Sequence, residues 1–331
     1  MTGLTLGTRG SPLALWQART VAAAVTAAGA VSCEIITVTT RGDREREADL
    51  SAIGGKRVFV KEIEEALMEG RVDLAVHSAK DLPSELPERL MIAAVLPRED
   101  PRDVLVLPTG RPGGDFHRIL ETFDRSTRIG TGSVRRVAQL RRLMVPTATF
   151  SAIRGNLDTR LRKLDEGQVD VLVLAAAGLE RLGMAHRISA RIPPEACLPA
   201  PGQGTIAVEV RCDDDGTRRL VEPISDPIAL ARLTAERSLV LGLGGGCQLP
   251  VGAIAEIAGE RLALKAIVIS LDGSEAIIGN IEGSVSRASA IGAELAARLL
   301  ALGAGRVLEQ ARLATATAPS TGNDKGEVDS A

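Results

Sequence analysis

Aromatic side chains are scarce in this chain of 331 residues, which has no tyrosine, one tryptophan and four phenylalanines. We therefore expect an aliphatic core of Val, Leu, Ile and Ala. So few rings argue against base stacking, and hence against a binder of single-stranded nucleic acid. The net charge of −2 supplies no basic field that would draw the protein to nucleic acid or to a membrane surface.

Cysteine is sparse as well. Cys33, Cys197, Cys212 and Cys247 lie far apart and form no CxxC pair. This spacing argues against a zinc site or a disulfide framework and predicts a reducing, cytoplasmic setting. No apolar run reaches 18 residues, so we expect no membrane span. The N-terminal MTGLTLGTRG predicts a strand and a turn, not a signal segment.

Lysine is the rare basic residue: only six of the 40 basic residues are lysines, and the others are arginines. A compositional bias of the genome would explain this. The alternative is that some arginine side chains bind carboxylates or phosphates through two parallel hydrogen bonds. The positions of the arginines have to decide between these explanations.

The order of predicted elements indicates an α/β protein. A β-loop-α pattern occurs in the first hundred residues and again in the second, and Pro-rich crossings (PREDP and LPAPGQG) separate the parts. Two such units predict two lobes around a cleft. The strand predicted at 205–211 could return to lobe one. The expected divisions are 1–97 with 204–222 (lobe one), 103–198 (lobe two), 226–314 (a small α+β domain with an antiparallel three-stranded sheet) and 315–331 (a disordered tail).

The stretch LAVHSAKDLPS at 74–84 is the most suggestive one. An apolar strand ends there and presents His77, Lys80 and Asp81 to a loop, the place where α/β proteins carry their chemistry. Asp81 could stabilise a cation or exchange a proton with a leaving amine, although a cap or an ion-pair partner is the simpler role. His77 could be a base, but a structural, hydrogen-bonded histidine is at least as plausible.

Arginines also occur at predicted helix starts. Arg9 and Ser11 lie in a glycine-containing loop before a helix predicted to begin at Pro12, although Ser11 could simply cap that helix. Arg135 and Arg136 lie in the first turn of the helix after RIGTGS. Cations at that end cost about 0.3–1 kcal/mol each. An anionic ligand therefore explains this pair better than helix stability does.

Cys247 stands in the flexible sequence GGGCQLP. A lone cysteine is most often a small buried hydrophobe, which suits Cys33 and Cys197. Three glycines before Cys247 instead suggest a thiol that is presented to something bulky, as a nucleophile or as a point of covalent attachment. No Cys-His-Asn pattern accompanies it. The polar stretch RGDREREADLSAIGGKR, which includes Lys56, is typical of a mobile lid.

Together, the motifs resemble one family. TRGSPLALWQA, VTTRGD, GGKRVFVKEIEEALMEGRVDLAVHSAKDLP, REDPRD, GTGSVRR, RGNLDTRL, LAAAGLERLG, LPAPGQG, TAERS and GGGCQLPVG occur in order between Leu4 and Val307. The chain is thereby similar to the porphobilinogen deaminase family, also called hydroxymethylbilane synthases. The resemblance implies two lobes like those of periplasmic binding proteins, and a third domain that carries a cysteine on a flexible loop.

The resemblance also implies a reaction. Cys247 would hold a dipyrromethane cofactor through a thioether, and four porphobilinogens would be added to it, each with loss of ammonia. Hydrolysis would then release hydroxymethylbilane. Asp81 matches the catalytic aspartate, which would stabilise the azafulvene cation and the pyrrole N–H groups. The family further implies a cytoplasmic, monomeric transferase of tetrapyrrole biosynthesis, without nucleic-acid or membrane partners and without a metal.

Each pyrrole carries an acetate and a propionate, so the resemblance gives the cationic and polar residues a role. The positions implied to bind the cofactor are Lys80, Thr131, Ser133, Arg135, Arg136, Arg154 and Gly155. Those implied to bind substrate are Arg9, Ser11, Lys56, Arg160, Arg181 and Gln203. The chain departs from the usual GTSSLRR at Gly132, where a small effect is expected, and the segment 108–125 is longer than is typical.

Two other functions share some of these features. A non-catalytic, two-lobed anion-binding protein would share the arginine and serine positions but would have no use for Asp81 or Cys247. A dinucleotide-dependent oxidoreductase is disfavoured, because no strand is followed by GxGxxG with an acidic residue about 20 positions later.

Overall fold

The computed structural model describes residues 3–29, 32–41, 60–143, 148–245 and 249–316. Lys56 and Cys247 lie outside these ranges, as do the predicted lid after Arg41 and the predicted tail from residue 317 onward.

The first sheet has five strands, β1 (Leu4–Thr8), β2 (Cys33–Thr37), β3 (Leu74–Ser78), β4 (Leu90–Val95) and β10 (Ile206–Arg211), in the order β2-β1-β3-β10-β4. β1 is parallel to β2 and β3, whereas β10 is antiparallel to β3 and β4. The helical elements of this part of the chain are α1 (Pro12–Ala27), α3 (Lys61–Met68), η2 (Ala79–Asp81), α8 (Asp215–Val221) and η4 (Glu222–Ile224).

The second sheet also has five strands, β5 (Asp103–Val106), β6 (Arg128–Gly130), β7 (Thr149–Ser151), β8 (Val171–Ala175) and β9 (Ala190–Arg191), in the order β7-β6-β8-β5-β9. β6 is parallel to β7 and β8, and β5 is antiparallel to β8 and β9. The helical elements here are α4 (Phe116–Glu121), α5 (Val134–Leu143), α6 (Leu157–Asp165), α7 (Ala176–Arg181) and η3 (Ala185–Arg187).

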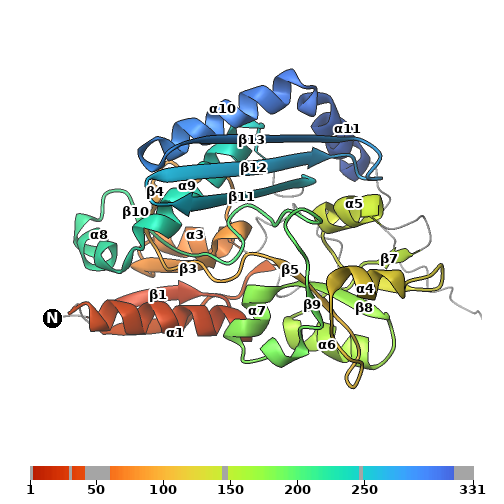
Figure 1. Cartoon of the computed structure of the whole chain (residues 1–331). Helices are drawn as coiled ribbons and strands as arrows, with labels where there is room; N and C mark the ends of the chain where they lie inside the picture. The colour runs from red at the N-terminus through yellow and green to blue at the C-terminus, as the bar shows by residue number, and fades with distance from the viewer. Residues whose placement is uncertain (1–2, 30–31, 42–59, 144–147, 246–248, 317–331) are drawn as a thin grey trace, which may run out of the picture.

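The third sheet is antiparallel throughout, with β11 (Val251–Ala258), β12 (Arg261–Ile269) and β13 (Ala276–Ser284) in chain order. Its helical elements are α9 (Pro227–Gly242), η5 (Val285–Arg287), α10 (Ala288–Ala301) and α11 (Ala304–Ala316). α10 packs on α9 and β13, and Figure 1 shows it on the outer side of this sheet, away from the other two. The predicted fold class is therefore confirmed: α/β with a small antiparallel three-stranded sheet.

The first two sheets have the same design, and each takes its fourth strand from a crossing of the chain. β5 follows the crossing that leaves the first sheet, and β10 follows the crossing that returns to it. The two crossings lie side by side, because the amide of Glu99 donates to the carbonyl of Gly204 at 3.0 Å. Gly204 has a φ of +86°, and a Cβ there would lie 2.4 Å from the Glu99 carbonyl oxygen. Only glycine suits this close approach.

The core is aliphatic, as expected. The largest fully buried side chains are all leucine or isoleucine, among them Leu6, Leu74, Leu105 and Ile129. β3 and β8, the central strands of the first two sheets, are buried at all but their last residue, as strands covered on both faces should be. The strands were predicted well because such runs of β-branched and leucine residues are easy to recognise.

Three helices were not predicted: α4, α8 and α11. α4 and α8 are short, with six and seven residues, so neither offers a long hydrophobic period. Each has an aspartate cap, Asp115 and Asp214, whose side chain accepts backbone amides. α11 runs to Ala316, so the predicted tail beginning at residue 315 is wrong for its first two positions. The other domain boundaries stay predictions.

A buried carboxylate joins the third sheet to the crossings. Glu236 of α9 is fully buried and binds the guanidinium of Arg98 at 2.6 and 3.2 Å. It also accepts the amides of Gly202 at 2.6 Å and Ala255 at 2.8 Å. Both carboxylate oxygens are thus occupied by groups from three separate segments.

No helix within the described ranges is both long and apolar enough to cross a membrane.

Candidate active site

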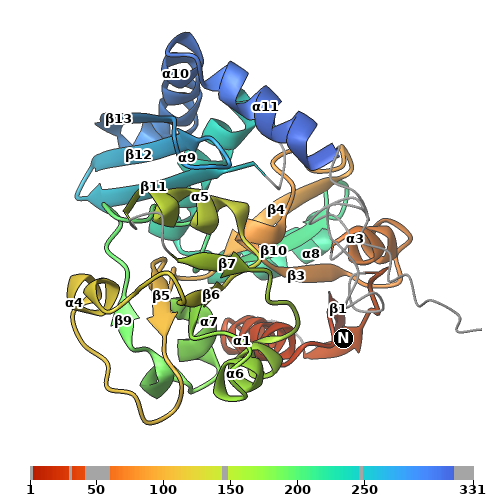
Figure 2. The same ribbon diagram turned by 90° about the vertical axis from the view of Figure 1, so that its right-hand side faces the viewer.

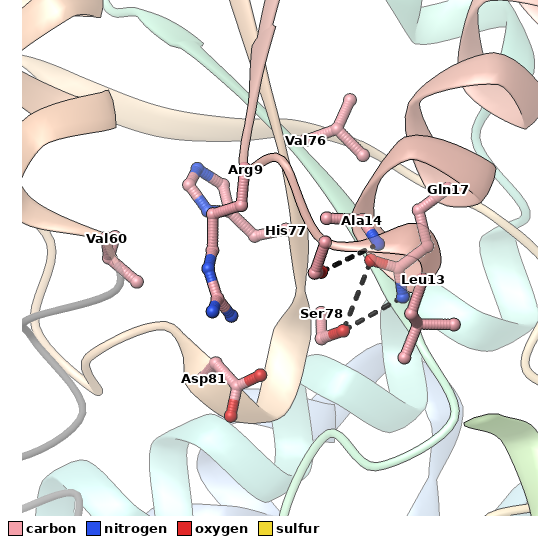
Figure 3. Close-up of a pocket in the computed structure, with 10 residues that line it drawn as sticks. Arg9, Leu13, Ala14, Gln17, Val60, Val76, His77, Ser78 and Asp81 are labelled. Atoms are coloured by element: carbon pink, nitrogen blue, oxygen red, sulfur yellow. Dashed lines mark hydrogen bonds between the residues drawn. The ribbon is translucent and has the colours of Figure 1, made fainter. Parts of the chain in front are cut away.

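A pocket lies where β1 and β3 end and α1 begins, and Figure 3 shows its lining side chains. Its cavity volume is about 80 Å³, well below the roughly 300–1,000 Å³ of small-molecule sites. Among the described residues it can therefore enclose only part of a ligand. It is lined by Arg9, Ser11, Leu13, Ala14, Gln17, Val60, Val76, His77, Ser78 and Asp81.

Asp81 reaches the pocket because β3 stops at Ser78 and the chain makes one turn of 3₁₀ helix, η2. Figure 3 shows the guanidinium of Arg9 extending toward the Asp81 carboxylate. Gln17, which is buried, donates to Ser78 Oγ at 2.9 Å and accepts from it at 3.3 Å. This pair ties α1 to the end of β3 and so holds the strand end that precedes Asp81.

Ser11 caps α1, as its simpler interpretation predicted. Its hydroxyl accepts the amide of Ala14 at 3.3 Å, and Pro12 occupies the first turn. Ser11 and Arg9 nevertheless line the same pocket as Asp81, so capping and ligand binding remain compatible.

The side chain of Lys80 contacts the crossing that returns to the first sheet. Its Nζ donates to Gln203 Oε1 at 3.1 Å. The amide nitrogen of Gln203 donates to the Pro101 carbonyl at 2.7 Å and to Asp103 Oδ1 at 2.8 Å. Gln203 is buried. One glutamine thus connects a lysine next to Asp81 with the first residue of β5 in the second sheet.

Arg135 and Arg136 converge on the same buried carboxylate, Asp103. Arg136 binds Oδ1 through Nε at 3.0 Å and Nη2 at 2.8 Å, and Arg135 Nη2 lies 2.7 Å from Oδ2. Arg136 Nη1 also donates to the Val173 carbonyl, and Arg135 Nη1 donates to the Leu198 carbonyl. Part of the negative charge that we had assigned to a ligand is therefore supplied by the protein.

Asp103 does not neutralise this cluster. Burial alone would raise the pKa of Asp103, but the charges of Arg135 and Arg136 outweigh burial and hold that pKa far below its ordinary value. One carboxylate then faces two guanidiniums. Arg135 Nε is buried and has no hydrogen-bond partner in the described part of the chain. An excess of positive charge remains.

The pKa of Arg160 reflects this excess of positive charge. Burial, together with the charges of Arg136 and Arg154, lowers the pKa of Arg160 to about 10, whereas the carboxylate of Asp81 acts to raise it. Arg160 is still charged at neutral pH. Since Asp81 belongs to the first lobe and the arginines to the second, the two lobes share one electrostatic site.

The remaining predicted residues lie around α5 and α6. Thr131 is buried and accepts the amide of Ser133 at 3.3 Å, and Ser133 Oγ lies 3.5 Å from the amide of Arg136. Gly155 has a φ of +109° and its carbonyl accepts Arg160 Nε at 2.8 Å. These contacts fix the loops before both helices.

Arg181 was predicted to bind substrate, and the structure shows it between the lobes. It is buried, donates to the carbonyl of Gly204 at 2.6 Å, and lies 5.7 Å from the ring centroid of Trp16. These contacts are structural, so substrate binding by Arg181 stays a prediction.

His77 is buried beside the carboxylate of Glu209. Its Nε2 lies 3.3 Å from Glu209 Oε2, and neither atom has a hydrogen bond of good geometry in the described structure. This environment agrees with a structural role for His77, although His77 also lines the pocket.

Asp103, Gln17 and Glu209 were missed by the sequence analysis as site residues. Asp103 ends REDPRD, one of the motifs of the family resemblance, but no role was predicted for it. The signal available was a charged residue that opens an apolar run, DVLVL, since a charge at the start of a buried strand needs a partner.

Comparison with known proteins agrees with this geometry. The family model described as "Porphobilinogen deaminase, dipyromethane cofactor binding domain" matches residues 4–219, and that described as "Porphobilinogen deaminase, C-terminal domain" matches residues 230–301. The porphobilinogen deaminase of Syntrophobacter fumaroxidans is 45% identical over 306 residues, which cover 92% of this chain and 96% of that protein. That of Roseiflexus castenholzii is 47% identical over 301 residues, 91% of this chain and 96% of that protein.

Solved structures that resemble the chain include the BvgS VFT2 domain of Bordetella pertussis (TM-score 0.41, 15% identity, 67% of this chain and 85% of that one). Another is a TRAP periplasmic solute binding protein from Desulfovibrio salexigens (TM-score 0.40, 11% identity, 67% and 72%). The family matches are decisive: the chain belongs to the porphobilinogen deaminase family, whose larger matched domain binds the dipyrromethane cofactor.

Proposed function

We propose that this chain is a porphobilinogen deaminase, a transferase that joins four porphobilinogens head to tail and releases hydroxymethylbilane. The observation that carries the proposal is the cluster of cationic side chains that shares an electrostatic site with Asp81. Arg135 and Arg136 share one carboxylate, and burial, together with the charges of Arg136 and Arg154, lowers the pKa of Arg160. A ligand with several carboxylates would balance this cluster.

The dipyrromethane cofactor fits the residues present. Arg136, Arg154, Lys80 and Gly155 would hold its acetate and propionate groups, with Thr131 and Ser133 beside them, and Cys247 would be the point of attachment. When bound, the cofactor supplies the pyrrole carbon to which the first substrate is joined. The buried, unpaired Nε of Arg135 is a further donor that an anionic group could satisfy.

Asp81 would act on the incoming substrate. Each addition breaks the C–N bond of the substrate's aminomethyl group, releases one ammonia and forms one C–C bond. Positive charge develops on the substrate pyrrole as the amine leaves, and an ionised carboxylate at the mouth of the pocket stabilises that charge. Arg9, Ser11, Arg160 and, from the lid, Lys56 would orient the substrate carboxylates, so that the reacting ring faces Asp81.

We also propose a cellular setting, partners and an oligomeric state for the protein. The even charge balance and the separated cysteines support a cytoplasmic protein without nucleic-acid or membrane partners, and the family resemblance supports a monomer. Sedimentation of the purified protein would measure the oligomeric state.

Intact mass tests the function. Incubation of the protein with porphobilinogen should add the mass of two pyrrole units, and Cys247→Ala should abolish the adduct. The matched control is Cys212→Ser, because Cys212 is exposed and belongs to no predicted site. An active protein of unmodified mass would contradict the cofactor attachment. An unmodified, inactive protein that binds pyrrole carboxylates would support the non-catalytic anion-binding alternative.

A further inference from the structure

Asp103 has an unusual position for a carboxylate. Its side chain is fully buried at the start of β5, where the chain enters the second sheet. Oδ1 accepts Arg136 Nε, Arg136 Nη2 and Gln203 Nε2, at 3.0, 2.8 and 2.8 Å. Oδ2 lies 2.7 Å from Arg135 Nη2 and 3.6 Å from the thiol of Cys197. These partners are all side chains, and they come from three segments outside β5.

These contacts fix the orientation of the Arg136 guanidinium. Arg136 presents Nε and Nη2 to one carboxylate oxygen, and its Nη1 donates to the Val173 carbonyl at 2.7 Å. A planar fork bound along two of its edges cannot rotate. A solvent-exposed arginine would lose its rotamer freedom at the moment of ligand binding. An arginine already held loses less, so a ligand that it contacts is bound more tightly.

The same carboxylate reaches the other lobe. Gln203 donates to Asp103 and accepts from Lys80 Nζ at 3.1 Å. Because the amide donor of Gln203 is occupied by Asp103 and by Pro101, its oxygen is turned toward Lys80. Lys80 directly precedes Asp81 in η2. Asp103 therefore orients a cation beside the catalytic aspartate as well as two arginines of the second lobe.

From these contacts we propose that Asp103 is a positioning residue, which orients Arg135, Arg136 and, through Gln203, Lys80 toward the carboxylates of the pyrrole chain. It touches no reacting atom in this arrangement. The inference rests on the proposed function for the identity of the ligand. The orientation itself is a property of the protein alone, and it can be measured without the cofactor.

The first test measures orientation in the cofactor-free protein. In a Cys247→Ala background, the Nε–H of Arg136 should exchange with solvent at least about 10²-fold more slowly than that of the exposed Arg162, because a buried hydrogen bond holds it. ¹⁵N NMR would resolve the signals, and Arg136→Lys would identify the Arg136 resonance by its loss. Equal exchange rates for the two arginines would overturn the proposal at once.

The second test compares Asp103→Asn and Asp103→Glu with Asp100→Asn. Asp100 is a fair control because it is close in sequence and pairs with Arg102 at 2.8 Å and Arg191 at 3.0 Å, outside the Asp103 network. Both Asp103 variants should fold by circular dichroism and lose Arg136 protection. Cofactor loading with porphobilinogen, followed by intact mass, should slow at least about tenfold, and KM should rise more than kcat falls. Asp100→Asn should change none of these.

Several results would contradict the role. Folded Asp103 variants with normal loading and KM would overturn it, and failure of both to fold would show that Asp103 serves only stability. A parent protein that acquires no pyrrole adduct would instead refute the proposed function, and the exchange measurement would still report whether Asp103 holds Arg136.

Discussion

At the scale of single residues, the site is defined by which charges have partners. Asp103 has several cationic or polar partners, whereas the arginines around it outnumber the carboxylates. Asp81 contributes to the electrostatics of Arg160 in the other lobe. Replacing a single side chain here should therefore change the binding of anionic ligands.

We expect Asp81→Ala to fold and to lose turnover by about 10²-fold or more, because a carboxylate that stabilises transition-state charge is removed. Thermal melting would check folding, and hydroxymethylbilane formation would check activity. The control is Asp272→Ala, in the β12–β13 turn, whose carboxylate accepts from the neighbouring Ser270 and Ser274. Near-normal product formation by Asp81→Ala would refute the role of Asp81.

The cysteines should differ in reactivity. Burial raises the pKa of the Cys197 thiol to about 12, and burial, with Asp73, also raises that of Cys33. Cys212 is exposed. Since the thiolate is the nucleophile, iodoacetamide at pH 8 should modify Cys212 before Cys33 and Cys197, with Cys197 the last of these three. Peptide mass mapping measures the order, and the Cys197 rate should rise as the pH approaches its pKa. Early modification of Cys197 in folded protein would contradict the burial argument.

At the scale of elements, helix starts carry several of the proposed binding groups. The loop before α5 supplies Thr131 and Ser133, and α5 then presents two arginines in its first turn. α6 does the same with Arg160, held by the carbonyl of Gly155. The sequence predicted these helices and their charged first turns. It did not predict that Asp103, from a strand elsewhere in the sheet, would be the partner of the α5 arginines.

Arg160 should lower the stability of the fold while it promotes cofactor binding. Its pKa is lowered to about 10, so the charge of Arg160 costs stability at every pH below that value, and the cost falls only as the pH rises from about 10 toward the ordinary pKa of arginine. Arg160→Met in the Cys247→Ala background should therefore raise stability by about 1 kcal/mol, allowing for partial solvent screening. The same substitution in the otherwise unsubstituted chain should slow cofactor loading.

The matched control is Arg162→Met on the same helix, where an exposed side chain pairs with Glu166 at 3.5 Å. It should alter neither urea denaturation nor loading. A lower stability of Arg160→Met with unchanged loading would show that Arg160 is a structural residue.

At the scale of the whole molecule, the chain passes twice between the two lobes, and the third sheet is tied to both passages. Figures 1 and 2 show the third sheet with its helices packed over the region between the other two. Glu236 makes the tie through Arg98, Gly202 and Ala255. The arrangement of the lobes that face each other across the site thus depends on a buried ion pair.

Glu236→Gln should destabilise the protein by about 3–5 kcal/mol, because it leaves Arg98 buried without a compensating charge. Urea denaturation measures the free energy of unfolding. Glu222→Gln, which breaks an exposed pair with Arg218 at 3.4 Å, should change it by less than about 0.5 kcal/mol. Equal effects of the two substitutions would show that the buried pair contributes nothing special.

Local sequence patterns were enough to predict the aliphatic strands, most of the helices and the residues that family motifs single out, because strand and helix periodicity and short motifs are local properties. The helices α4, α8 and α11 were not predicted; α4 and α8 are short capped helices, which have little periodicity. Only the tertiary structure decided which charges meet. Asp103 is 33 positions from Arg136 and 100 from Gln203, and such pairings follow from how two crossings and two sheets pack, which no local pattern in the chain encodes.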